Sequence, residues 1–119
     1  MKKLLTVLIA LTLTAAVFAG GKKDASKTDT SLEDLKAKGT FILGLDDSFP
    51  PLGYRNDDNE IVGFDIDLAR EVCSRLGVKL ICQPIDWDAK EQELSNAKID
   101  CIWNGLTITE ERENAMTMS

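Results

Sequence analysis

The chain has 119 residues and a formal net charge of −6 at pH 7, with 14 lysines and arginines against 20 aspartates and glutamates. The basic residues are dispersed among carboxylates, so no basic stripe could follow a phosphate backbone, and we expect no nucleic-acid partner. The chain has no histidine, and its cysteines lack the close spacing of zinc ligands, so we expect no metal site. We also expect no cofactor. A chain of this length forms one small domain at most.

The first 30 residues predict a leader and a linker rather than folded structure. Residues 1–19 join two lysines to an apolar run that is too short to cross a bilayer comfortably, which is typical of a secretory signal peptide cut after Ala19. An uncleaved anchor helix is the alternative. Residues 20–30 are nearly free of apolar side chains and predict a flexible tether. The first cysteine is Cys73, so no lipid-accepting cysteine follows the leader.

From residue 31 onward, short apolar runs alternate with amphipathic helical patterns. Residues 40–45 are bulky and β-branched, whereas Ile66, Ala69 and Cys73 recur at helical spacing. Such alternation is typical of a right-handed, mostly parallel α/β layer. The expected elements are a helix over 31–39, a strand over 40–45, a hairpin with arms 52–54 and 60–63, a helix over 65–77, a strand over 78–82, a helix over 88–96, a strand over 99–103 and a helix over 107–114.

Start and stop signals bound several of these helices. Ser31 and Thr107 each stand three residues before a carboxylate, at the spacing of a capping box, and Asp65 precedes an apolar run with helical spacing. Gly39 and Gly77 end two helices, since glycine readily takes the left-handed conformation found there. Asp65 is therefore expected to cap a helix rather than to bind a ligand.

Three loops follow the carboxyl ends of the predicted strands, over residues 46–51, 84–88 and 104–107. In open sheets of parallel strands, ligands meet the loops at these ends. We therefore expect the functional residues of the chain in these three loops.

The three cysteines leave two alternatives open. In an oxidising compartment two of Cys73, Cys82 and Cys101 could form a disulfide and leave one thiol over, but their number does not choose the pair. The other interpretation is three small buried thiols that fill the core.

Four motifs in the chain together resemble family 3 of the bacterial solute-binding proteins. The resemblance runs from about Leu32 to Ser119 and implies an α/β fold of the periplasmic-binding-protein-like type II. Members of that family are longer and have a second lobe, so residues 31–119 would form the N-terminal portion of an incomplete first lobe, with a mostly parallel sheet and flanking helices. The motifs are Phe49-Pro50-Pro51, Gly63-Phe64-Asp65-Ile66-Asp67-Leu68-Ala69, Ile99-Asp100-Cys101-Ile102 and Gly105-Leu106-Thr107-Ile108-Thr109-Glu110-Glu111-Arg112.

The resemblance implies that three residues hold the charged groups common to all amino acids. Arg112 matches the guanidinium that clamps the α-carboxylate, and its planar fork suits two charge-assisted hydrogen bonds. Thr107 matches the residue that shares this carboxylate through its hydroxyl and backbone N–H. Gly105 matches the residue whose carbonyl accepts the ligand ammonium. The alternative for Arg112 is an ordinary surface arginine on a helix rich in glutamate.

Four further residues are implied in contacts with the rest of the ligand. Phe49 and Trp87 match positions that sandwich the ligand side chain between aromatic faces, although either could simply cover the core. Asp46 matches a position that contacts a polar or cationic group in some members. Asn104 either orients the ligand loop or stabilises a turn.

The resemblance implies an extracytoplasmic amino-acid-binding receptor of an ABC transporter, located in the periplasm or outside the cell. Its partners would be a free amino acid, polar or basic, and a membrane permease. Because one lobe leaves ligand charges exposed to screening, we expect residues 31–119 alone to bind weakly or not at all. The alternatives are a partial gene without function, an enzyme on the same fold (a dehydratase or a cell-wall lytic protein), and the sensor domain of a membrane kinase.

Overall fold

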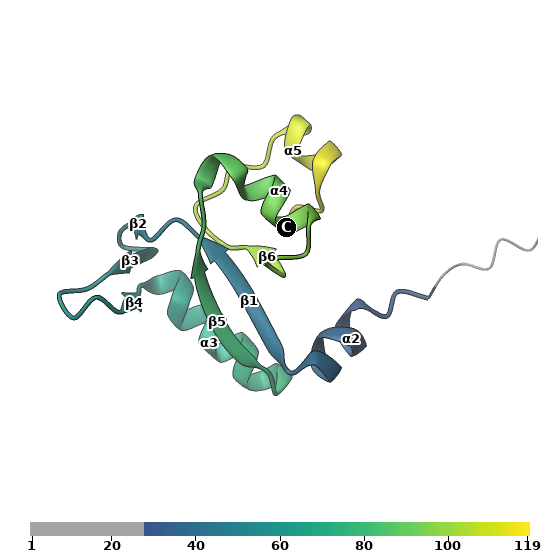
Figure 1. Ribbon diagram of the computed structural model, residues 1–119, viewed down its shortest axis with the longest axis horizontal. Helices are drawn as coiled ribbons and strands as arrows, with labels where there is room; N and C mark the ends of the chain where they lie inside the picture. Colours follow the sequence, from purple (N-terminus) through teal and green to yellow (C-terminus); the bar gives the residue numbers. More distant parts are fainter. Residues whose placement is uncertain (1–27) are drawn as a thin grey trace, which may run out of the picture.

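A three-stranded parallel sheet lies at the centre of residues 28–119, which are the residues that the computed structural model describes (Figure 1). The strand order is β5–β1–β6, and both pairings are parallel, which confirms the predicted α/β class. The predicted signal peptide over 1–19 and most of the tether over 20–30 lie outside the described residues. The strands are β1 (Thr40–Leu45), β5 (Lys79–Pro84) and β6 (Cys101–Ile102).

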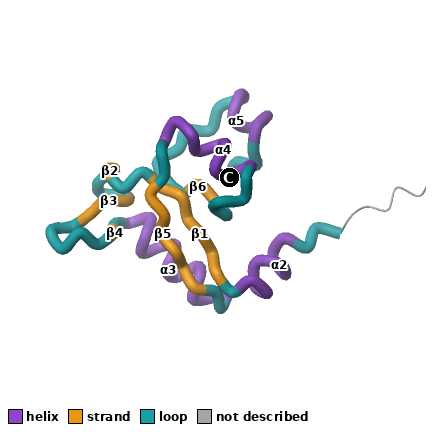
Figure 2. The backbone as a smooth tube through the Cα atoms, in the orientation of Figure 1, coloured by secondary structure: helices purple, strands orange, loops and turns teal. Residues whose placement is uncertain are grey.

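Helices flank this sheet along the chain. Figure 2 shows α3 running beside β1 and β5, while α4 and α5 lie near the end where the chain stops. Within the described residues, every helix falls short of the length and apolar character that crossing a bilayer would require. The helices are α2 (Ser31–Lys38), α3 (Phe64–Leu76), the 3-10 turn η1 (Trp87–Ala89), α4 (Lys90–Ser95) and α5 (Glu110–Ala115).

The core lies between the central strand β1 and helix α3. Leu43 and Leu45 of β1 are fully buried and pack with Ile66 and Ala69 of α3. β1 has a neighbouring strand on each edge, and its last three residues are buried, whereas its first three are half-buried. Cys73 continues the buried stripe of α3, at the helical spacing that the sequence predicts.

A second, antiparallel sheet packs beside the first and contains the predicted hairpin. Its order is β2–β3–β4, and the pairing of β3 with β4 confirms the hairpin arms. Strand β2 was not predicted, because residues 46–51 were expected to form a loop throughout. The Leu52 amide donates to the Phe49 carbonyl at 3.0 Å and folds β2 back against β3. The strands are β2 (Ser48–Phe49), β3 (Gly53–Arg55) and β4 (Ile61–Val62).

Gly63 joins this hairpin to α3 in a way that only glycine allows. Its φ is +135°, and a Cβ there would lie 2.2 Å from the Leu52 carbonyl oxygen. The amides of Phe64 and Asp65 donate to the carbonyls of Pro51 (3.0 Å) and Leu52 (2.9 Å). These bonds satisfy two amides of the first helical turn with hairpin carbonyls. Asp65 is consequently buried inside that turn, so the prediction that it caps α3 is wrong.

The ends of the first two helices agree with the sequence, but the start of α2 does not. Gly39 and Gly77 have φ angles of 77° and 73° and end α2 and α3 in the left-handed conformation, as predicted. Helix α2 begins at Ser31, so Thr30 occupies the capping position predicted for Ser31. The Thr30 hydroxyl donates to the Asp34 carboxylate at 2.9 Å, which is a side-chain bond and not a cap of the backbone.

The last third of the chain is less regular than its sequence suggests. The predicted helix over 88–96 is divided into η1 and α4, and the predicted strand over 99–103 pairs only at β6. Helix α5 begins at Glu110, and the Thr109 hydroxyl accepts from the Arg112 amide at 3.3 Å. The capping residue is therefore Thr109, and the prediction of a helix capped by Thr107 is wrong.

Candidate ligand-binding site

The loops that follow β1, β5 and β6 leave the parallel sheet at one edge. The Ile85 amide donates to the Leu45 carbonyl at 3.1 Å, and the Trp103 amide donates to the Gly44 carbonyl at 3.0 Å. These bonds continue the strand pairing just past the ends of β5 and β6. The three loops that the sequence selects therefore start side by side, at the edge where ligands meet sheets of this kind.

Phe49 and Gly105, from two different loops, are in direct contact. A Cβ at Gly105 would lie 2.6 Å from Cε1 of the Phe49 ring, so the ring packs against the glycine backbone. The Phe49 side chain is nevertheless 41% exposed. Close approach of the Phe49 ring thus gives a steric reason for glycine at 105, beside the expected one that a side chain there would crowd the ligand ammonium.

Arg112 and Thr107 are also brought together. Nη1 of Arg112 donates to the Thr107 carbonyl oxygen at 2.7 Å. A guanidinium has five N–H donors, so this bond leaves others for a carboxylate. Among residues 28–119 the Arg112 guanidinium forms no ion pair, although glutamates stand on both sides of it in α5.

Asp46 has a local role in its own loop. Oδ1 of Asp46 accepts from the Ser48 amide at 2.9 Å and closes a turn after β1. Its neighbour Asp47 forms an ion pair with Arg55 of β3, which fastens the loop to the hairpin. A ligand contact by Asp46 would use the other carboxylate oxygen, so the local bond is compatible with the implied role but also explains the residue without it.

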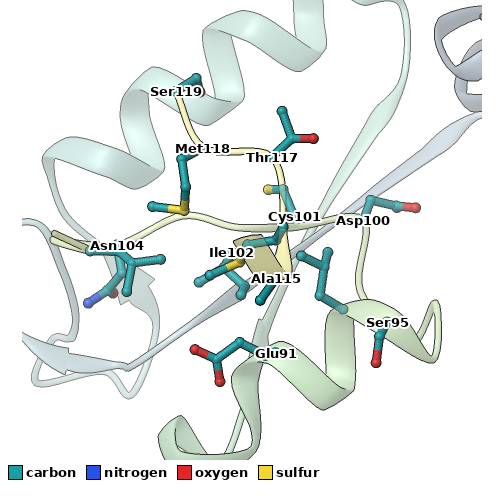
Figure 3. Close-up of a pocket in the computed structure, with 13 residues that line it drawn as sticks. Glu91, Ser95, Asp100, Cys101, Ile102, Asn104, Ala115, Thr117, Met118 and Ser119 are labelled. Carbon is teal, nitrogen blue, oxygen red and sulfur yellow. The ribbon is translucent and has the colours of Figure 1, made fainter. Parts of the chain in front are cut away.

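Asn104 lines a cavity of about 480 Å³ (Figure 3). Figure 3 shows Ile102 and Asn104 on one side of this cavity and Thr117 to Ser119 on another. Oδ1 of Asn104 is buried and has no hydrogen-bond partner among the described residues. The local turn is closed instead by the backbone, since the Leu106 amide donates to the Asn104 carbonyl at 2.7 Å. The side chain therefore does not stabilise that turn, which was one of its two expected roles.

Trp87 begins η1 at the end of the loop after β5, and Lys90 holds it. Nζ of Lys90 donates to the Trp87 carbonyl at 3.1 Å and lies 5.2 Å from the centre of the Trp87 ring. Lys90 is buried, which the sequence did not lead us to expect. One sequence signal could have indicated this burial. Lys90 stands four residues before Leu94, a spacing that places both side chains on one face of a helix, and Leu94 is itself partly buried.

Arg112 and Lys90 line a second cavity, of about 380 Å³, between α4 and α5. Asn104 and Arg112 thus open onto separate cavities rather than one. The structure joins the candidate residues in pairs, Phe49 with Gly105 and Thr107 with Arg112. The remaining residues that line the second cavity are Glu91, Glu111 and Ala115.

All three cysteines carry free thiols. Leu43 stands in register with both Cys82 and Cys101, so the two cysteines are two strand spacings apart, about 9.6 Å between Cα atoms. That separation exceeds what a disulfide spans. Burial raises the pKa of each thiol, that of Cys101 to about 12 with a further contribution from the Asp100 carboxylate. The structure therefore has free thiols rather than a disulfide, with Cys73 buried and Cys82 and Cys101 half-buried.

No group of three or more cysteine, aspartate or glutamate side chains is arranged to hold a metal ion within residues 28–119. The chemistry available at the sheet edge is instead hydrogen bonding from a guanidinium and from main-chain groups, beside aromatic faces. Such groups recognise a small molecule that carries a carboxylate.

The chain belongs to the bacterial extracellular solute-binding proteins, family 3, which it matches over residues 41–119. The four motifs had indicated this family, and the match confirms it. Solved structures of similar proteins have the same fold over most of this chain, as the TM-scores below show. The expected class, an α/β partial domain with a parallel sheet and flanking helices, is therefore confirmed as well.

Three similar proteins illustrate the family. The L-cystine-binding protein TcyJ of Escherichia coli (strain K12) is 29% identical over 107 residues, which cover 90% of this chain and 40% of TcyJ. An ABC uptake transporter substrate binding protein from Streptococcus pneumoniae, solved with bound histidine, is 39% identical with a TM-score of 0.69, and the match covers 73% of this chain and 35% of that one. The arginine-bound form of domain 1 from TmArgBP is 42% identical with a TM-score of 0.65, over 68% of this chain and 64% of that domain.

Proposed function

We propose that this chain is part of an extracytoplasmic receptor that captures a free amino acid, polar or basic, and presents it to the permease of an ABC transporter. Membership of the family supports this proposal, as do the three similar proteins, whose names give cystine, histidine and arginine. The chain spans 40% of the length of TcyJ, so the activity of a whole receptor is part of the proposal.

The observation that carries the proposal is the position of the Arg112 guanidinium. It is bonded to the Thr107 carbonyl at 2.7 Å, and the backbone amide of Arg112 is bonded to the Thr109 hydroxyl. Both bonds hold the arginine at the loop after β6, which leaves the sheet beside the loop that contains Phe49. A guanidinium held in this way needs little reorganisation to receive a carboxylate in two parallel hydrogen bonds.

The other contacts follow the family resemblance. The ligand ammonium would meet the Gly105 carbonyl, and its side chain would lie against Phe49 and Trp87. The exposed part of the Phe49 ring and the partly buried Trp87 ring offer aromatic faces that attract apolar and cationic groups alike. Asp46 is proposed as a secondary contact, because its second carboxylate oxygen is not used in the turn after β1. The role of Asn104 rests on the resemblance alone, since its buried Oδ1 faces a different cavity from that of Arg112.

The test is isothermal titration calorimetry of the chain against a panel of free amino acids, with Arg112→Met beside a matched control. The control is Arg75→Met, since Arg75 is 79% exposed on α3 and pairs with Glu71. We expect Arg112→Met to weaken every ligand about 30-fold or more, because the carboxylate is common to all of them. Arg75→Met should change affinity by less than about twofold. Unchanged binding in Arg112→Met, with the fold intact by circular dichroism, would refute the proposed clamp.

The same titration measures how tightly residues 31–119 bind an amino acid on their own. One lobe leaves a side of the ligand in water, which screens its charges. Domain 1 of TmArgBP nevertheless has an arginine-bound form. We therefore expect residues 31–119 to bind measurably but weakly, as the N-terminal portion of a first lobe. Residues 1–19 as signal peptide, 20–30 as tether, and a periplasmic or extracellular location complete the proposal.

We propose binding rather than catalysis for the same reasons. The three similar proteins are named for what they bind, and none is named for a reaction. Turnover of a prephenate-like substrate or of peptidoglycan would instead favour the enzyme alternative. A folded chain that binds no free amino acid would favour the alternative of a gene fragment without function.

A further inference from the structure

Lys90 is placed where lysines are seldom found. Its side chain is 10% exposed, whereas those of Lys38 and Lys98 are 43% and 60% exposed. Burying an ammonium is unfavourable unless its hydrogen bonds and its charge are met by the protein. The contacts of Lys90 therefore indicate what this burial accomplishes.

Most of these contacts are with Trp87. Nζ of Lys90 donates to the Trp87 carbonyl at 3.1 Å and lies 5.2 Å from the centre of the Trp87 ring, within the range of a cation–π contact. Nζ of Lys90 also forms an ion pair with Oε1 of Glu91 at 3.6 Å, which compensates part of its charge. Lys90 thus fixes both the backbone and the ring of an aromatic residue that is proposed to contact the ligand.

This contact also changes what the Trp87 ring can attract. The negative face of an aromatic ring favours a cation, and Lys90 already supplies one. A ligand cation on the opposite face would lie within about 6 Å of the ring centre, and hence about 10 Å from the Lys90 ammonium. The ammonium would repel it, and at that separation the repulsion amounts to about threefold to tenfold in affinity after partial screening.

We infer that Lys90 is a positioning residue that acts through Trp87 and shifts the preference of the site from cationic toward neutral polar amino acids. This inference rests on the proposed function, and it narrows the ligand class of that function. Lys90 also lines the cavity of Arg112, together with Glu91 and Glu111. Any effect of Lys90 on Arg112 changes the binding of the shared α-carboxylate, so it weakens or strengthens all amino acids equally.

The test compares ligands that differ in charge but hardly in shape, so that effects on the carboxylate cancel. The two pairs are arginine with citrulline and ornithine with glutamine. For each pair the ratio of the cationic to the neutral affinity is measured by calorimetry in the 119-residue chain and in three variants. Lys90→Met removes the charge and the hydrogen bond, Lys90→Gln removes the charge but keeps an N–H donor for the Trp87 carbonyl, and Lys90→Arg keeps the charge.

We expect the ratio to rise about threefold to tenfold in both neutral variants and to stay within about twofold of the unchanged protein in Lys90→Arg. Lys90→Gln provides the answer if Lys90→Met does not fold by circular dichroism. An unchanged ratio in a folded neutral variant, even with both affinities lowered, would mean a merely structural lysine and would overturn the inference. If the unchanged chain binds no member of the amino-acid panel, the proposed function is overturned together with the inference.

Discussion

The two halves of the described chain are held in place by different interactions. In the half made of β1, α3 and β5, residues are buried by regular pairing and by a helical stripe that packs on Leu43 and Leu45. In the half from Trp87 onward, α4 and α5 are only six residues long, and short loops carry most of the candidate site. The first half supplies stability, and the second is positioned by single hydrogen bonds. Changes in the first should therefore act on folding, and changes in the second on binding.

The largest effect is expected in the core. Leu43→Ala should lower the free energy of unfolding by about 3 kcal/mol, because it leaves a cavity in place of a fully buried side chain. Leu43 belongs to the central strand, which pairs with β5 and β6. Leu68→Ala is the matched control, since Leu68 is 45% exposed on α3, and it should cost less than about 1 kcal/mol. Urea unfolding followed by circular dichroism measures both. Similar losses for the two variants would mean that the first half is not organised around β1.

Gly63→Ala tests the joint between the hairpin and α3. An added Cβ would meet the Leu52 carbonyl at 2.2 Å, and backbone atoms cannot step aside as a side chain can. We expect a loss of about 2 kcal/mol or more in the free energy of unfolding. Gly77→Ala also has a positive φ but meets nothing within 4 Å, so it should cost about 1 kcal/mol. Equal losses would show that strain at a positive φ, and not the close approach, determines Gly63.

Gly105→Ala makes the corresponding change in the second half, where a different outcome is expected. Its Cβ would lie 2.6 Å from the end of the Phe49 ring, a side chain that is 41% exposed and can swing outward. Stability should fall by less than about 1 kcal/mol. The affinity for amino acids, measured by calorimetry, should fall about fivefold, because the displaced ring no longer lines the site. A large loss of stability with unchanged affinity would contradict the expectation that changes in the second half act on binding rather than on folding.

The same contrast explains how much could be predicted from the sequence. The strand β1, the hairpin, the stripe of α3 and the ends at Gly39 and Gly77 were predicted, because each depends on periodicity or on a local glycine conformation. Asp65 was misplaced as a cap, since its burial depends on carbonyls of the hairpin. Periodic patterns carry no information about such distant partners.

The candidate site was predictable in location but not in detail. Parallel order alone brings the three loops to one edge. The motifs supplied Phe49 and Arg112, but not the contact of Phe49 with Gly105 or the bond from Arg112 to the Thr107 carbonyl. Lys90 was missed because a lysine in a polar stretch normally lies in solvent. These details depend on how loops from different strands meet, which no local pattern encodes.

The buried thiols produce an effect that appears only at high pH. Burial and the Asp100 carboxylate raise the pKa of Cys101 to about 12, from an ordinary value of 9.0. The folded state therefore holds this proton longer than the unfolded state does. Its contribution to stability is complete below pH 9 and is lost as the pH rises from about 9 to about 12.

Cys101→Ala should accordingly flatten the decline of stability between pH 9 and 12, when its unfolding curves are compared with those of the unchanged protein. Below pH 8 the free energies of unfolding of the variant and of the unchanged chain should vary with pH in parallel, because the thiol is neutral in the folded and unfolded states. Labelling gives an independent measure: a thiol reagent at pH 8 should modify Cys73 and Cys101 slowly in the folded chain and rapidly in urea, since reaction requires an exposed thiolate. Rapid labelling of Cys101 in the folded chain would show that β6 separates from β1. The core would then not extend across the parallel sheet from Cys82 to Cys101, the two cysteines in register with Leu43.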